Sequence, residues 1–105
     1  MNEIEIKGGA RVGSTHCSFP LATLKVDKDR LILKVAFIGT LIFRATDIIS
    51  IESYIVIPLI GQGIKITHTV TNYKKRVIFW TFKNPQSVIR QIESTGFIGE
   101  KDFFV

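Results

Sequence analysis

Apolar and polar residues alternate along most of the chain, and the period changes once, near residue 83. Before that point the runs are short and apolar residues fall at every second position, which is typical of β-strands with one buried face. We expect Phe37 to lie on the same face as Leu33 and Val35, and Ile49 on the same face as Ile51. Five strands are predicted in this way, at residues 21–26, 31–37, 40–44, 47–54 and 64–70. A sixth strand is predicted at residues 77–82, which are apolar on both faces, so both sides of it are expected to be covered.

The first 20 residues have a weaker pattern. Residues 3–7 alternate and predict a short edge strand. Gly8, Gly9 and Gly13 then break the alternation, and without a following helix or lysine they do not form a phosphate-binding loop. The chain is therefore predicted to be one domain with an extended or irregular lead-in at residues 1–20, a core at 21–97 and a tail at 98–105.

After residue 83 the apolar residues repeat with helical spacing. Asn84 is a favourable N-cap residue, and Pro85 suits the first helical position. Gly96 suits a left-handed C-terminal cap, after which Phe97 folds back onto the helix. The pattern predicts one amphipathic helix over residues 85–95, with its apolar stripe at Val88, Ile89 and Ile92.

Composition and charge change the picture only slightly. Hydrophobic residues make up 46% of the 105 residues and charged residues 22%, which indicates a folded globular protein. Fourteen Lys and Arg against nine Asp and Glu give a formal charge of +5. This charge favours an encounter with phosphate or an acidic lipid surface if the cations cluster, and otherwise serves only solubility.

No sequence feature predicts a membrane span or a disulfide. The longest uncharged run, residues 53–64, contains Pro58 and is shorter than the roughly 20 apolar residues that a spanning helix needs. The N-terminal residues do not resemble a signal peptide. Cys17 is the only cysteine, which excludes an intrachain disulfide. We expect a cytoplasmic protein with no transmembrane segment and no cofactor.

The predicted order, about seven short antiparallel strands followed by one amphipathic helix, resembles the pleckstrin-homology-like (PH-like) superfold. The chain looks like the bacterial PH-like and GRAM-like domains, many of which have no assigned ligand. The resemblance implies a mainly β fold, in which a bent sheet forms a partly open barrel and the helix plugs one end. It is carried by LKVDKDRL (24–31), DIISIE (47–52), GIKITH (63–68) and FKNP (82–85).

Two basic segments are candidate anion sites. In phosphoinositide-binding PH domains a basic pattern on the first hairpin cradles phosphates, and the resemblance implies this role for Lys25, Lys28 and Arg30. Asp27 and Asp29 alternate with these cations and would repel a phosphate, so a solvated hairpin is the competing interpretation. The second segment is a predicted basic turn that consists of Tyr73, Lys74, Lys75 and Arg76. Lys65 and Arg44 would add to its cluster of positive charge.

Two further segments have weaker signals. The apolar segment 55–60 is either a core strand bent at its proline or a surface for protein contact, through Ile55, Ile57, Leu59 and Ile60. His16, Cys17 and His68 have no spacing that would support a metal site or a Cys–His nucleophile pair.

The leading hypothesis is a non-enzymatic PH-like interaction module. It would contact a protein partner or a second copy of itself, through residues 55–60 or an exposed strand edge. The alternative is peripheral binding to acidic lipid headgroups at the inner membrane face, through the basic loops. A small enzyme is the third hypothesis. Nucleic acid is not an expected partner, because no series of aromatic residues alternates with the cations.

Overall fold

The computed structural model describes residues 3–56 and 61–97. Within these residues the chain forms seven strands, a short 3-10 helix and an α-helix: β1 (Ile4–Val12), β2 (Thr15–Val26), β3 (Arg30–Val35), β4 (Gly39–Arg44), η1 (Ala45–Asp47), β5 (Ile48–Val56), β6 (Gly61–His68), β7 (Val77–Thr81) and α1 (Pro85–Ser94).

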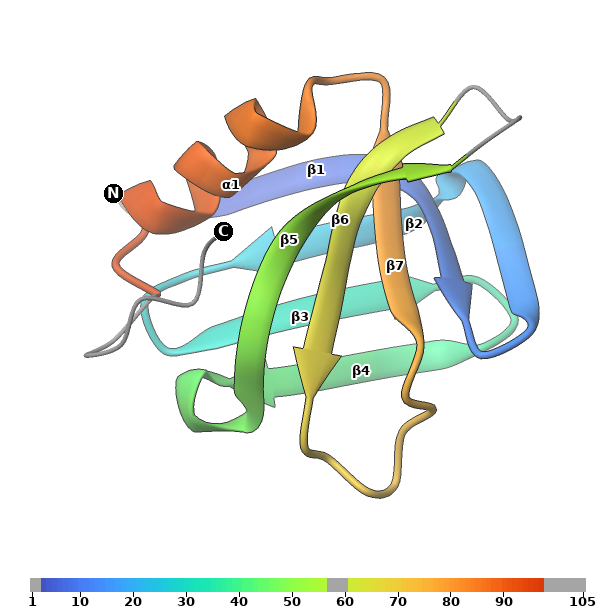
Figure 1. Ribbon diagram of the computed structural model, residues 1–105, viewed down its shortest axis with the longest axis horizontal. Coiled ribbons are helices and arrows are strands. Elements are labelled where there is room, and N and C mark those ends of the chain that lie inside the picture. Colours follow the sequence, from blue (N-terminus) through green and yellow to red (C-terminus); the bar gives the residue numbers. More distant parts are fainter. Residues whose placement is uncertain (1–2, 57–60, 98–105) are drawn as a thin grey trace.

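The seven strands make one antiparallel sheet in the order β4-β3-β2-β1-β7-β6-β5. The sheet curls on itself, so that β5–β7 pass across β1–β4 as a second layer (Figure 1). The edge strands β4 and β5 are joined by η1 but are not paired with each other, and the barrel is therefore partly open. The predicted fold class, a mainly β, partly open antiparallel barrel with one C-terminal helix, is confirmed.

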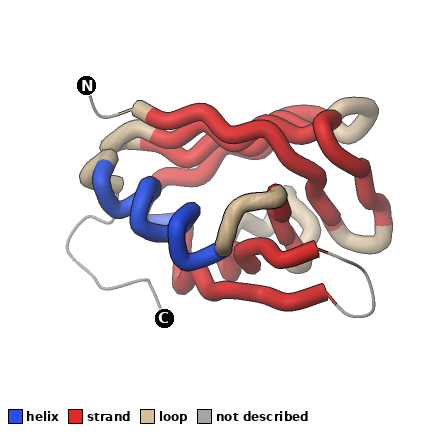
Figure 2. The backbone as a smooth tube through the Cα atoms, turned by 90° about the horizontal axis from the view of Figure 1, so that it is seen from above, coloured by secondary structure: helices blue, strands red, loops and turns tan. Residues whose placement is uncertain are grey.

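The core fills the space between the two layers. Leu31, Leu33 and Val35 of β3 are buried and alternate with more exposed residues, as the pattern predicted. The helix α1 lies beside the opening between the layers (Figure 2) and contributes a buried apolar stripe. That stripe consists of Pro85, Val88, Ile89 and Ile92.

The helix begins and ends as the sequence predicted. The Asn84 Oδ1 atom accepts a hydrogen bond from the backbone N–H of Gln86 at 2.7 Å, which satisfies one free donor at the helix start. Gly96 follows the helix with a φ of +84°, and Phe97 is fully buried in the core. The side-chain amide of Gln86 also donates to Ser53 Oγ at 2.7 Å, which ties the helix to β5.

The lead-in predicted at residues 1–20 as extended or irregular is corrected by the structure: residues 4–12 and 15–20 are extended, but they are strands of the sheet itself. β1 continues through Gly8 and lies between β2 and β7, and β2 already begins at Thr15. The predicted edge strand at residues 3–7 is the first half of β1, which pairs with β2 alone. Glycine is required inside this strand, since a side chain at position 8 would collide with the Trp80 carbonyl and the Phe79 ring.

Two residues that were predicted to share a face with neighbours, which are buried, are exposed instead. Ile48 pairs with His68 and Ser50 pairs with Thr67, so Ile49 is the extra residue of a β-bulge and is 57% exposed. Phe37 lies beyond the end of β3, in the turn to β4, with a φ of +69°. The bulge shifts the alternation within β5, because Ile48 and Ile51 are both buried although they lie three residues apart, and the apolar pattern of the sequence does not show where this shift occurs.

Candidate functional site

The first basic cluster lies at the turn between β2 and β3. Lys28 and Arg30 are exposed there, and Lys25 is half-buried. The Asp27 Oδ1 atom accepts hydrogen bonds from the backbone N–H groups of Asp29 at 2.8 Å and Arg30 at 2.9 Å. Asp27 therefore shapes the turn, and its negative charge stays among the three cations.

These two hydrogen bonds also affect the titration of Asp27. The N–H of Asp29, followed by that of Arg30, holds the pKa of the Asp27 carboxyl below its ordinary value, because both donors favour the charged form. A lowered folded-state pKa contributes stability above the ordinary aspartate pKa of about 3.9. That contribution is lost as the pH falls through the folded-state value, and so the turn weakens only in acid.

The second basic cluster, Lys74 to Arg76, is exposed on the loop between β6 and β7. Tyr73 anchors this loop to the edge of β4, because its Oη atom accepts a hydrogen bond from the backbone N–H of Ile42 at 3.0 Å. The ring of Tyr73 packs edge-on against Phe43, with the centroids 5.4 Å apart. The loop is thus fixed at its base, whereas its cations face the solvent.

The structure does not bring the two clusters together. Val26, which lies within the first cluster, pairs with Ile4, whereas Val77, just after the second cluster, pairs with Val12. The clusters therefore lie at opposite ends of β1, and nine extended residues place those ends on the order of 20 Å apart. One phosphate or one lipid headgroup cannot contact both.

Charge is divided unequally between the two layers. The strands β1–β4 contain six cationic residues and one acidic residue, whereas β5–β7 contain one of each. Arg30 and Arg44, one from each of two neighbouring strands, are directly opposite each other. Five of the six cations lie on the outer surface of β1–β4, which we call the cationic face: Lys7, Lys25, Arg30, Lys34 and Arg44.

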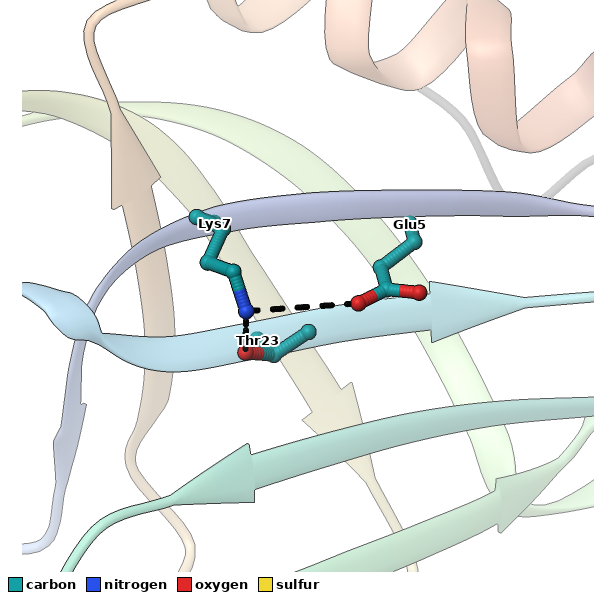
Figure 3. A network of polar contacts seen from close by, with 3 residues as sticks. All are labelled: Glu5, Lys7 and Thr23. Atoms are coloured by element: carbon teal, nitrogen blue, oxygen red, sulfur yellow. Dashed lines mark hydrogen bonds and ion pairs between the residues drawn. The ribbon is translucent and has the colours of Figure 1, made fainter.

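Strand register sets the spacing of these cations. Lys7 is opposite Thr23, which in turn is opposite Lys34. The Lys7 Nζ atom donates to Thr23 Oγ1 at 3.5 Å and lies 4.0 Å from Glu5 Oε2 (Figure 3). The Lys7 and Glu5 side chains are 60% and 54% exposed, so solvent screens most of their attraction. Glu5, the one acidic residue in β1–β4, thus offsets little of the positive charge.

Apolar side chains are interspersed with the cations on this face. Ile42 of β4 is exposed and lies opposite the half-buried Ile32 of β3. At the β3–β4 turn, Leu21 and Phe37 border an open depression of about 500 Å³ that also contains Lys34. The residues around this depression include no acidic side chain.

The edge of β4 is partly closed to another strand. Two of its backbone donors already have side-chain acceptors: the N–H of Ile42 binds Tyr73 Oη, and that of Arg44 binds Asp47 Oδ2 at 2.9 Å. A strand added along this edge would have to displace both acceptors. Protein contact through a strand edge, one of the predicted modes, is therefore disfavoured at β4.

A second exposed apolar feature lies near the end of β7. Phe82 is 81% exposed and packs on the partly exposed Phe19 of β2, with the ring centroids 4.9 Å apart. Trp80, two residues earlier, is half-buried and close to the backbone of Gly9. The contact segment predicted at residues 55–60 was not tested, because residues 57–60, with Ile57, Leu59 and Ile60, and the side chain of Ile55 lie outside the described residues.

His16, Cys17 and His68 have separate environments. Cys17 is buried, with its Sγ atom donating to the Ala36 carbonyl at 3.2 Å, whereas His16 is exposed beside Trp80. His68 Nδ1 accepts from the N–H of Val70 at 3.0 Å, which leaves Nε2 to donate to the Lys74 carbonyl at 2.8 Å. Within residues 3–56 and 61–97, no three His, Cys, Asp or Glu side chains are grouped to hold a metal ion.

Among the helices in the described part of the chain, none has the length and apolar character needed to cross a bilayer. Comparison of the chain with known protein families and with curated protein sequences finds no match.

Proposed function

We propose that the chain is a non-enzymatic PH-like interaction module that binds an acidic membrane surface through its cationic face. The observation that carries this proposal is the charge difference between the two layers, six cations and one acid against one of each. An outer sheet face with distributed positive charge is complementary to the uniform negative charge of acidic lipid headgroups.

The geometry favours an extended charged surface over a single headgroup. The two predicted basic clusters lie at opposite ends of β1, and the Asp27 carboxylate remains within the first of them. By contrast, Lys7, Lys25 and Lys34 come from three adjacent strands of one face. Self-association through this face would bring like charges together, which is unfavourable.

Removing three cations from the cationic face tests the proposal. The wild-type chain should co-sediment with vesicles that contain acidic phospholipid at low salt and should dissociate as salt is raised. The triple variant Lys7→Gln, Lys25→Gln, Lys34→Gln should bind about 100-fold more weakly, since each basic residue near such a surface contributes about 1 kcal/mol. Zwitterionic vesicles should bind neither protein.

A second triple variant is the matched control. Lys74→Gln, Lys75→Gln, Arg76→Gln gives the same net charge but leaves the cationic face intact. It should lose much less affinity than the first variant. Equal losses in the two triple variants, or no binding of the wild type to acidic vesicles at low salt, would contradict the proposal.

Contact with another protein is the second candidate function, and the exposed Phe19–Phe82 pair favours it. Exposed aromatic side chains that pack on each other are typical of the residues enriched in protein interfaces. Binding of this kind would persist at high salt and would be lost in Phe82→Ser, which distinguishes it from the electrostatic binding proposed above.

A further inference from the structure

The turn between β3 and β4 holds a phenylalanine in an unfavourable position. Phe37 has a φ of +69°, a conformation that bulky side chains rarely adopt and that glycine or asparagine adopts readily. Its side chain is also 97% exposed, so packing against the other described residues does not offset the backbone strain. Glycine or asparagine at this position would make the fold more stable. The presence of phenylalanine therefore indicates a function other than stabilising the fold.

Backbone hydrogen bonds hold the turn that contains Phe37. The N–H of Ile38 donates to the Val35 carbonyl at 3.1 Å, and Val35 pairs with Gly39 where β4 begins. The turn is therefore tight, and Phe37 lies at its tip. An aromatic residue on a tight turn loses little conformational freedom when it binds a partner, because its backbone is already fixed.

The surroundings of Phe37 indicate what it contacts. Leu21, which is 45% exposed, and Lys34 border the same depression, and Lys7 lies in the same row of the sheet as Lys34. An apolar tip with two lysines on the neighbouring sheet face matches the boundary between headgroups and acyl chains in an acidic bilayer. A second copy of the chain does not match, because it would present the same lysines.

We infer that Phe37 is an interfacial membrane anchor. The ring enters the boundary between headgroups and acyl chains of an acidic bilayer, while Lys34 and Lys7 contact the headgroups. This inference rests on the proposed membrane function and adds to it a specific inserted residue and the orientation in which the sheet meets the bilayer.

The first test compares two Phe→Ala variants on acidic vesicles. Phe37→Ala should bind roughly 10-fold or more weakly than the wild type, because the buried part of the ring is lost. Phe82→Ala removes a similarly exposed ring that packs on Phe19 and does not border the depression beside Phe37, and it should lose much less affinity than Phe37→Ala. A third variant, Phe37→Gly, should bind as weakly as Phe37→Ala but have a Tm equal to or above that of the wild type.

The second test measures insertion directly. In Phe37→Trp, tryptophan fluorescence should be quenched by lipids brominated near the headgroup, and more strongly than in the wild type, where Trp80 alone reports. If the wild type binds acidic vesicles but Phe37→Ala binds equally well, or if Phe37→Trp shows no added quenching, the anchor is refuted and the proposed function stands. If the wild type does not bind these vesicles at all, the proposed function itself fails.

Discussion

Replacing Phe97 with alanine is expected to lower the free energy of unfolding by about 4 kcal/mol. The side chain is fully buried and follows the left-handed Gly96, so it fixes the end of the helical segment in the core. Domains of this size are stable by only about 5–15 kcal/mol, and Phe97→Ala should therefore lose between about a quarter and four-fifths of its stability. Urea denaturation followed by circular dichroism measures the change.

Phe82→Ala is the matched control, because it is the same substitution at a residue that is 81% exposed. It should change the free energy of unfolding by no more than about 0.5 kcal/mol. A small effect of Phe97→Ala, comparable to that of the control, would mean that the segment after the helix does not pack on the sheet.

The second large effect is expected for Gly63→Ala, which should destabilise the chain by about 3 kcal/mol. A methyl group on Gly63 would lie 2.8 Å from Trp80 Cβ and 2.9 Å from Trp80 Cα, and closer still to the Phe79 carbonyl oxygen. Backbone atoms cannot turn away as a side chain can, and so β6 and β7 would have to separate. Thermal unfolding and denaturant titration both measure this loss.

Gln62→Ala serves as the comparison, since Gln62 is the exposed neighbour of Gly63 in the same strand. Its effect should stay within about 0.5 kcal/mol. If Gly63→Ala were equally harmless, the close approach of β6 to β7 at this point would be refuted.

Local features of the chain were predictable from the sequence where one residue type determines the backbone. The N-cap at Asn84 and the left-handed Gly96 set the two ends of the helix, and both were predicted correctly. Alternation likewise identified the buried face of β3, because a half-buried strand needs apolar residues at every second position.

Non-local features were not predictable in the same way. Gly8 was interpreted as a strand breaker, although the crossing of β7 is what requires a glycine there. The bulge at Ile49 depends on pairing with β6, and the turn at Phe37 depends on where β3 stops. A single sequence does not show which strands pair or where each strand stops. The predictions for these three residues were wrong for that reason.

The cationic face shows the same limit. The sequence pointed to cations adjacent in the chain, such as Lys74 and Lys75, because neighbours along the chain are visible without a structure. Lys7 and Lys34 were missed, although each occupies a polar position of an alternating strand. Only the order β3-β2-β1 brings these two residues onto one face.

Footprinting of lysines on the vesicle-bound chain tests most directly which surface meets the membrane. An amine-reactive reagent, read out by mass spectrometry, should label Lys7, Lys25 and Lys34 much less in the presence of acidic vesicles than in their absence. Labelling of Lys74 and Lys75 should change little. Protection of these two loop lysines instead of the three on the cationic face, or no protection at any lysine, would contradict the account.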